Sequence, residues 1–247
     1  MPELGSATAG PALRPLRRVG HKGADLIAPG NTSESFDAAL AAGVDMIEFD
    51  VLSEHPDGSG RLLLAHDYRA LRAREPYTLD QALAHLAGEE FAQVEFDVDL
   101  KLPGYEVQVV EALQAAGLAE RAMVSSMYRE SLRRVRAAEP ALKLGWSVPR
   151  VRRDYTTDPL TKIPAAAVIA GYRLLLPRRA REAIRGGACD AIMAQWRLVT
   201  PALVRAVNGA GGELYAWTVD DPVRITTLRG LGVTGIISND PRLFATA

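Results

Sequence analysis

The chain of 247 residues has little of what would mark a secreted, membrane-spanning or nucleic-acid-binding protein. Its single cysteine, Cys189, excludes an intramolecular disulfide, so the fold does not need an oxidising compartment. No run approaches the roughly 18 consecutive apolar residues of a membrane span. With 29 basic and 30 acidic residues, the formal charge of -1 leaves no basic surplus for nucleic acid. We expect a cytoplasmic protein with no stable membrane insertion and no nucleic-acid partner.

The amino-terminal segment MPELGSATAGPALRP lacks the apolar run of a signal peptide. We interpret residues 1–14 as a flexible lead and residues 15–247 as one domain. Apolar residues make up 48% of the chain and charged residues 24%, which is typical of a globular enzyme with a sizeable core.

Short apolar strands alternate with helical segments along the whole domain. The predicted strands are 18–21, 46–52, 94–101, 122–126, 142–147, 190–194, 213–218 and 235–238. The predicted helices are 33–42, 79–87, 106–116, 130–138, a long region 158–185, 201–209 and 222–231. This rhythm predicts the α/β class and a single (β/α)8 TIM barrel. Residues 61–67 predict a short extended insertion after the second strand.

Two histidines flank a pair of carboxylates early in the chain. His21 stands in GHKG and His66 in LLAHD, and the segment IEFD between them carries Glu48 and Asp50. Alternate strand residues share a face, so both carboxylates point the same way and can hold a divalent cation. Two histidines close by can transfer protons near neutral pH. The combination predicts metal-assisted cleavage of an ester.

A later strand, VEFDVDLK, carries four ionisable side chains on one face, at positions 95, 97, 99 and 101. Its apolar face must turn to the surrounding helices, so the charged face turns into the barrel. Burying those charges without partners would be prohibitive. We expect a cation near Asp99 with Lys101 beside it, and structural pairing with basic or hydroxyl groups for Glu95 and Asp97.

These motifs, in this order, resemble the glycerophosphodiester phosphodiesterase family. The family pattern is HRG, PEN[ST] with a following Phe, a helix ending in G-x-D, IE-x-D-V and HD. The later motifs IEIK, W-T-V-N and GI-x-T-D-x-P resemble VDLK, WTVDD and GIISNDP here. A fit of this length is far more specific than any short motif.

The resemblance implies the site and its chemistry. The family substrate is a glycerophosphodiester, cleaved to glycerol 3-phosphate and an alcohol after attack by the glycerol 2-hydroxyl. His21 and His66 would be the acid–base pair, and Glu48, Asp50 and Asp99 would bind Mg or Ca through hard oxygen ligands. The implied substrate-binding residues are Lys22, Asn31, Lys101, Ser126 and Trp217. Asn31 and Ser126 could contact substrate or orient other residues.

Three departures from the family pattern bear on this assignment. Lys22 replaces Arg and offers a point charge in place of a bidentate fork. Gly30 removes the Glu of PEN, and Asp99 replaces a Glu with a shorter ligand. The stretch 67–78 is also brief, which predicts an open mouth.

Two other functions are compatible with the same residues. One is a phospholipase D-like lyase acting on sphingomyelin or lysophospholipid, which shares the His, Glu-x-Asp, His pattern. The other is a barrel that binds an anion or a metal but has lost catalysis through the changes at Lys22 and Gly30.

Overall fold

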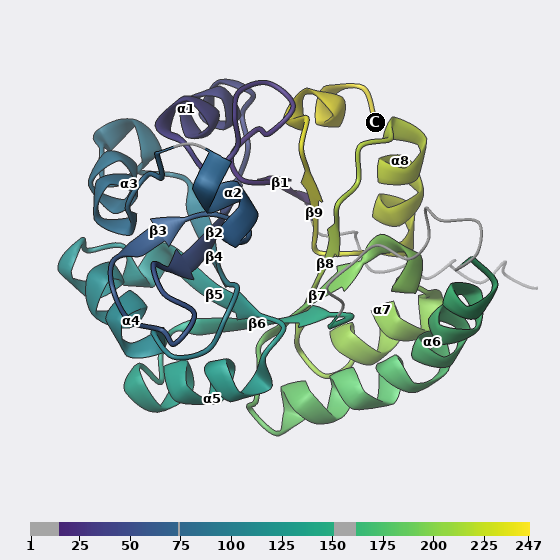
Figure 1. Cartoon of the computed structure of the whole chain (residues 1–247). Coiled ribbons are helices and arrows are strands. Elements are labelled where there is room, and N and C mark those ends of the chain that lie inside the picture. The colour runs from purple at the N-terminus through teal and green to yellow at the C-terminus, as the bar shows by residue number, and fades with distance from the viewer. Residues whose placement is uncertain (1–14, 74, 151–161) are drawn as a thin grey trace, which may run out of the picture.

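Eight parallel strands close into a barrel with the helices arranged around it (Figure 1). The computed structural model describes residues 15–73, 75–150 and 162–247, so the predicted lead 1–14 lies outside the described residues. Strand β1 pairs with both β9 and β2, which closes the ring. The barrel strands are β1 Arg17–Gly20, β2 Met46–Ser53, β4 Glu95–Leu100, β5 Ala122–Ser126, β6 Lys143–Val148, β7 Ala191–Gln195, β8 Glu213–Trp217 and β9 Gly235–Ser238. The predicted TIM barrel is confirmed.

The insertion after β2 forms a strand and a helix that cover one side of the barrel mouth (Figure 1). Strand β3, Leu62–Leu64, pairs antiparallel with β2, and helix α2, Tyr68–Ala73, follows it. The sequence pattern does not predict α2. The remaining helices are α1 Ser33–Ala41, α3 Leu79–Leu86, α4 Glu106–Ala115, α5 Arg129–Ala138, α6 Lys162–Arg185, α7 Pro201–Asn208 and α8 Pro222–Leu231.

Local hydrogen bonds set where several helices begin and end. The hydroxyl of Thr32 accepts from a backbone N–H in the first turn of α1, and Thr78 does the same for α3. Asp221 caps α8 in the same way, directly before a proline at the first helical position. Gly232 ends α8 in the left-handed conformation, with φ 85°, which glycine adopts without steric cost.

The alternation along β4 separates an apolar core from a polar interior. Phe96 and Val98 are 0% exposed and belong to the large cluster between the strands and the helices. Burying a phenylalanine of this kind contributes about 1.5–3 kcal/mol. Asp97 and Asp99 point to the other face, into the barrel, as the pattern predicts, and Asp99 is in register with Asp50 on β2. A second apolar cluster, which includes Met123, Met193 and Tyr215, fills part of the barrel interior.

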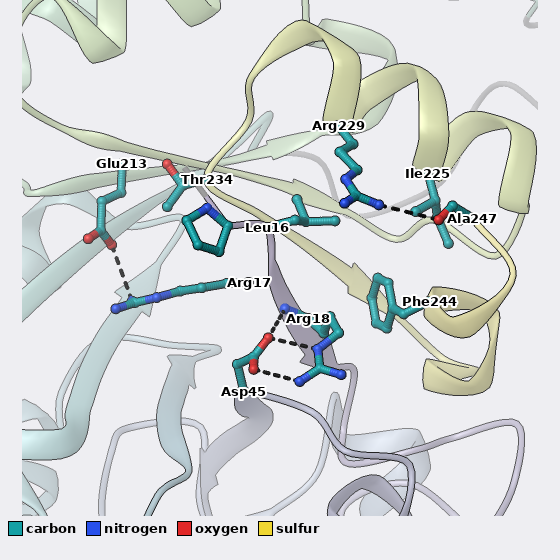
Figure 2. Close-up of a pocket in the computed structure, with 11 residues that line it drawn as sticks. Leu16, Arg17, Arg18, Asp45, Glu213, Ile225, Arg229, Thr234, Phe244 and Ala247 are labelled. Atoms are coloured by element: carbon teal, nitrogen blue, oxygen red, sulfur yellow. Dashed lines mark hydrogen bonds and ion pairs between the residues drawn. The ribbon is translucent and has the colours of Figure 1, made fainter. Parts of the chain in front are cut away.

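At the amino-terminal end of the strands, arginines and carboxylates pair with each other (Figure 2). Arg17 lies 2.7 Å from Glu95 and 3.7 Å from Glu213, which confirms the structural pairing expected for Glu95. Arg18 binds Asp45 through its side chain at 2.8 Å and through its backbone N–H at 2.7 Å. These pairs hold β1 against the residue that precedes β2 and against the first residues of β4 and β8.

We predict that Asp45→Asn destabilises the protein in a pH-dependent way. Burial raises the pKa of Asp45, but the hydrogen bonds from Arg18 outweigh it and hold the pKa below its ordinary value of 3.8. A carboxyl group whose pKa is lowered by folding stabilises the native state above its unfolded pKa and loses that effect as the pH falls. We expect a loss of about 1 kcal/mol at pH 7, discounted because the pair is partly exposed, and a smaller loss at pH 3, below the ordinary pKa of the carboxyl group.

Urea unfolding of the parent and the variant at the two pH values measures this difference. Glu111→Gln is the matched control, because Glu111 is exposed on α4. An equal loss at pH 3 and pH 7 would contradict the assignment of the stabilisation to the ionised carboxylate.

Candidate active site

A cavity of about 140 Å³ opens at the carboxyl ends of the strands, where TIM barrels carry their chemistry. Strands and loops far apart in the sequence contribute to its wall. The lining residues are His21, Glu48, His66, Asp97, Asp99, Lys101, Ser125, Met127, Ser147, Met193, Trp217, Thr218 and Ile237. The fold thus brings both predicted histidines, two of the three predicted metal ligands and Lys101 to one cavity.

The three predicted metal ligands lie together. One oxygen atom from each of Glu48, Asp50 and Asp99 falls within 4.8 Å of the others, and all three residues are buried. The ammonium of Lys101 lies 2.5 Å from Asp50 Oδ1 and also contacts Asp99 Oδ2. Three hard oxygen donors at this spacing fit a divalent cation, and Lys101 shows that the cluster already attracts positive charge.

Burial and mutual repulsion raise the pKa values of the acids in this cavity, whereas neighbouring cations lower them. Burial, followed by the charge on Asp50, raises the pKa of Glu48 well above its ordinary value. Burial would also raise the pKa of Asp50, but Lys101 and the two histidines lower it further than burial raises it. Burial and neighbouring Asp99 raise the pKa of Asp97 to about 8. The cluster therefore gains from any additional cation, because it carries more negative charge than Lys101 neutralises.

His21 follows β1 directly and is held on both sides of its ring. Its Nδ1 lies 2.5 Å from the side-chain oxygen of Asn239, and its Nε2 lies 3.8 Å from Glu48 Oε2. Burial, followed by the positive charge of Lys22, lowers the pKa of His21. The neutral imidazole is therefore favoured at neutral pH, which suits a proton acceptor.

His66 is exposed, whereas His21 is largely buried. It follows β3 on the insertion, and its side chain is 55% exposed. Its Nδ1 lies 3.4 Å from the carboxylate of Asp67. That carboxylate also accepts hydrogen bonds from the backbone N–H groups of Arg69 and Ala70, which begin α2. The insertion thus carries His66 to the mouth and places a negative charge beside its ring.

Lys22 does not line the cavity, although the sequence resemblance implies that it holds phosphate. Its backbone N–H donates to Glu48 at 2.8 Å, and its ammonium binds Asp25 at 3.1 Å. Asp25 also accepts from the backbone N–H of Gly30 at 2.8 Å. A Cβ at Gly30 would lie only 2.4 Å from Asp25 Oδ1, so the glycine leaves room for a carboxylate that the sequence analysis does not identify.

Asn31 and Ser126, for which the sequence left substrate contact and orientation of other residues open, both hydrogen-bond to protein groups. Asn31 donates to Asp50 Oδ2 at 2.9 Å and accepts from the Asp50 backbone N–H at 3.0 Å, so it orients a metal ligand. Ser126 donates to the carbonyl of Leu100 at 2.8 Å and does not line the cavity. Its neighbour Ser125 lines the cavity and lies 3.3 Å from Asp99 Oδ1. Adjacent strand residues point to opposite faces, so a shift of one residue in the strand register decides which of the two serines faces the cavity.

Trp217 forms part of the cavity wall at the end of β8. Its indole N–H donates to the carbonyl of Met193 at 2.9 Å, which fixes the plane of the ring. The apolar ring is half-buried and faces the same space as His21. It can therefore cover the carbon skeleton of a small polyol.

A larger depression of about 710 Å³ lies at the opposite end of the barrel (Figure 2). Its charged residues already have partners, since Arg18 binds Asp45 and Arg17 binds glutamates. Arg229 donates to the carbonyl of Ala247 at 3.4 Å. The greater volume of this depression does not make it the active site, because the charged side chains that line it already pair with other protein groups.

Comparison with known proteins agrees with the chemistry of the smaller cavity. The model of the glycerophosphoryl diester phosphodiesterase family matches residues 76–243, more than half of the chain. The chain belongs to this family. Its members are phosphoric diester hydrolases, and the motif with His21 and His66 precedes the matched region.

Individual relatives cover nearly the whole chain. A glycerophosphodiester phosphodiesterase from Caldanaerobacter subterraneus subsp. tengcongensis is 25% identical, covering 90% of this chain and 93% of its own. A crystal structure from Silicibacter pomeroyi has a TM-score of 0.71 at 19% identity, covering 94% of both chains. A phosphodiesterase from Oleispira antarctica, in complex with sn-glycerol-3-phosphate, has a TM-score of 0.67 at 18% identity and covers 94% of this chain and 96% of its own. At these identities the structures establish the fold.

No helix among the described residues is long and apolar enough to cross a membrane.

We predict that the family member binds a divalent cation through its buried acids. Titration with Mg²⁺, Ca²⁺ or Mn²⁺ should raise the melting temperature, because a ligand that binds only the native state stabilises it. Glu48→Ala, Asp50→Ala and Asp99→Ala should each abolish the metal-dependent rise. Asp37→Ala is the control, since Asp37 contacts His85 on the surface. Retention of the full rise in all three variants would contradict this site.

Proposed function

We propose that this protein is a metal-dependent phosphodiesterase that hydrolyses glycerophosphodiesters to glycerol 3-phosphate and an alcohol. The observation that carries the proposal is the convergence of two histidines, a triad of carboxylates and a lysine on one small cavity. Family membership supports the reaction class. The product bound to the Oleispira antarctica relative supports the glycerol phosphate portion of the substrate.

Glu48, Asp50 and Asp99 would hold the cation, with Mg²⁺ or Ca²⁺ as the candidates suited to an all-oxygen donor set. When bound, it would supply Lewis-acid stabilisation of negative charge on the phosphate. Asn31 keeps Asp50 oriented for this purpose through two hydrogen bonds. Loss of an outer contact of this kind typically costs about 10- to 100-fold in metal affinity or activity.

Lys101 is the side chain best placed to contact a non-bridging phosphate oxygen. It lines the cavity, whereas the ammonium of Lys22 is held by Asp25 outside it. Lys101 already lies against two of the carboxylates, so a phosphate beside the cation would meet positive charge from both. A charge-assisted hydrogen bond of this type is worth roughly 1.5–3 kcal/mol.

The surroundings of the two histidines favour different roles. Burial favours the neutral ring of His21, and its Nε2 lies on the side of Glu48, so His21 would accept the proton of the attacking glycerol hydroxyl. His66 lies at the mouth of the cavity beside the carboxylate of Asp67, so it would donate a proton to the leaving alcohol. The roles would reverse when water opens the resulting cyclic phosphate.

We predict that His21→Ala and His66→Ala each lower turnover of glycerophosphocholine by about 10²- to 10⁴-fold. A nitrophenyl phosphodiester, whose leaving group needs no proton, should restore turnover in His66→Ala and leave His21→Ala inactive. His85→Ala is the control, because His85 pairs with Asp37 on the surface. Steady-state rates on the two substrates, with and without a chelator, test the assignment.

Three outcomes would contradict it. Rescue of His21→Ala in place of His66→Ala would reverse the roles. Full activity after exhaustive chelation would remove the metal from the reaction. Metal binding without turnover of any phosphodiester would make the protein an anion- and metal-binding barrel.

We also predict unequal effects of the two lysines on kcat/KM. Lys101→Ala should lower it by about 10- to 100-fold, the loss expected for one charge-assisted phosphate contact. Lys22→Ala should lower it by less than about tenfold, because that ammonium contacts Asp25. Circular dichroism confirms that both variants fold. Equal losses, or a larger loss for Lys22→Ala, would show that Lys22 moves to the phosphate when substrate binds.

A further inference from the structure

Two residues behind His21 have no part in the scheme above. Asn239, at the end of β9, offers its side-chain oxygen to His21 Nδ1 at 2.5 Å. The amide nitrogen of Asn239 donates to Asp220 Oδ2 at 2.7 Å, and its backbone N–H donates to Asp220 Oδ1 at 2.8 Å. Ser238 adds a third hydrogen bond to Asp220 at 3.0 Å. Asp220, which follows β8, therefore holds Asn239 by both its backbone and its side chain.

These hydrogen bonds have only one consistent direction. An ionised carboxylate is only an acceptor, so the NH₂ group of Asn239 must face Asp220 and its oxygen must face His21. An oxygen acceptor beside Nδ1 requires that Nδ1 carry the ring proton. A neutral imidazole has one N–H, so the lone pair lies on Nε2, the atom nearer Glu48 and the cavity.

The sequence departs from the family pattern at both of these positions. The pattern W-T-V-N has asparagine where this chain has Asp220, and GI-x-T-D-x-P has aspartate where this chain has Asn239. Each change alone is a modest substitution. The structure places the two side chains in direct contact, so the chain retains one amide and one carboxylate with their positions exchanged.

The exchange changes the chemical group that contacts the ring of His21. In this chain the neutral amide oxygen of Asn239 contacts the ring, and the carboxylate of Asp220 contacts the amide instead of the ring. The amide holds the Nδ1–H tautomer without placing a negative charge against the ring. A ring in this state can accept a proton at Nε2 and is not held in the charged form.

We propose that Asp220 and Asn239 form an exchanged positioning pair that locks His21 in the Nδ1–H tautomer, so that Nε2 accepts the proton in the reaction. The assignment of His21 as proton acceptor rests on the proposed function. The tautomer of His21 and the coupling between Asp220 and Asn239 do not rest on the proposed function, and they are measured separately.

The test compares Asp220→Asn, Asn239→Asp and the double exchange with the parent. Asp220→Asn should release the amide and give a mixture of ring tautomers. Asn239→Asp should place two carboxylates in contact beside the ring. Each single variant should lower kcat by about 10- to 100-fold with little change in KM, the range seen for groups that orient a site histidine. The double exchange should restore kcat to within about threefold, since it rebuilds one amide–carboxylate contact.

Two-bond ¹H–¹⁵N correlation spectra of the histidine rings give a readout that a merely structural role would not move. The parent and the double exchange should show His21 protonated at Nδ1, and Asp220→Asn should not. If Asn239→Asp fails to fold, Asn239→Ala replaces it in the test, because it removes the acceptor without adding charge. Asp221→Asn is the matched control, because this neighbouring carboxylate caps α8 and does not contact Asn239.

The proposal is overturned if the single variants keep the parent's kcat and tautomer, or if the double exchange loses as much as both singles together. A parent that turns over no phosphodiester would end the proposed function. The ring spectra would still decide whether Asp220 and Asn239 fix the tautomer.

Discussion

The cost of burying carboxylates inside the barrel is the constraint on which the rest of the site depends. Glu48, Asp50 and Asp99 share a space that excludes most water, and an isolated ion there would be unstable. Lys101 compensates two of them and Asn31 satisfies Asp50 further. Burial, followed by the charge on Asp50, still raises the pKa of Glu48, so the compensation is incomplete and a divalent cation bound to the three acids would add to it.

The same constraint explains how the two histidines come to differ. His21 lies within this buried group, where desolvation and neighbouring cations favour the neutral ring. His66 reaches the cavity from the insertion, is mostly exposed and lies beside Asp67. Two chemically identical side chains thus meet different surroundings, and a reaction that moves one proton in each direction needs two such groups.

Departures from the family pattern are compensated by residues nearby in space. The glutamate missing at Gly30 leaves room for Asp25, which binds both the Gly30 backbone and Lys22. The exchanged amide and carboxylate at positions 220 and 239 contact each other directly. In both cases a nearby carboxylate hydrogen-bonds to the residue that departs from the motif.

The barrel, the order of its strands and the residues that carry chemistry can be read from the sequence, because strand and helix periodicities and ordered motifs are local properties. The sequence also placed His21, Glu48, Asp99 and Lys101 at the strand ends that meet in the cavity. Two features came from the fold alone. Lys22 binds Asp25, and Ser125 rather than Ser126 lines the cavity. Those outcomes depend on a one-residue register and on partners from distant segments. No local pattern encodes either.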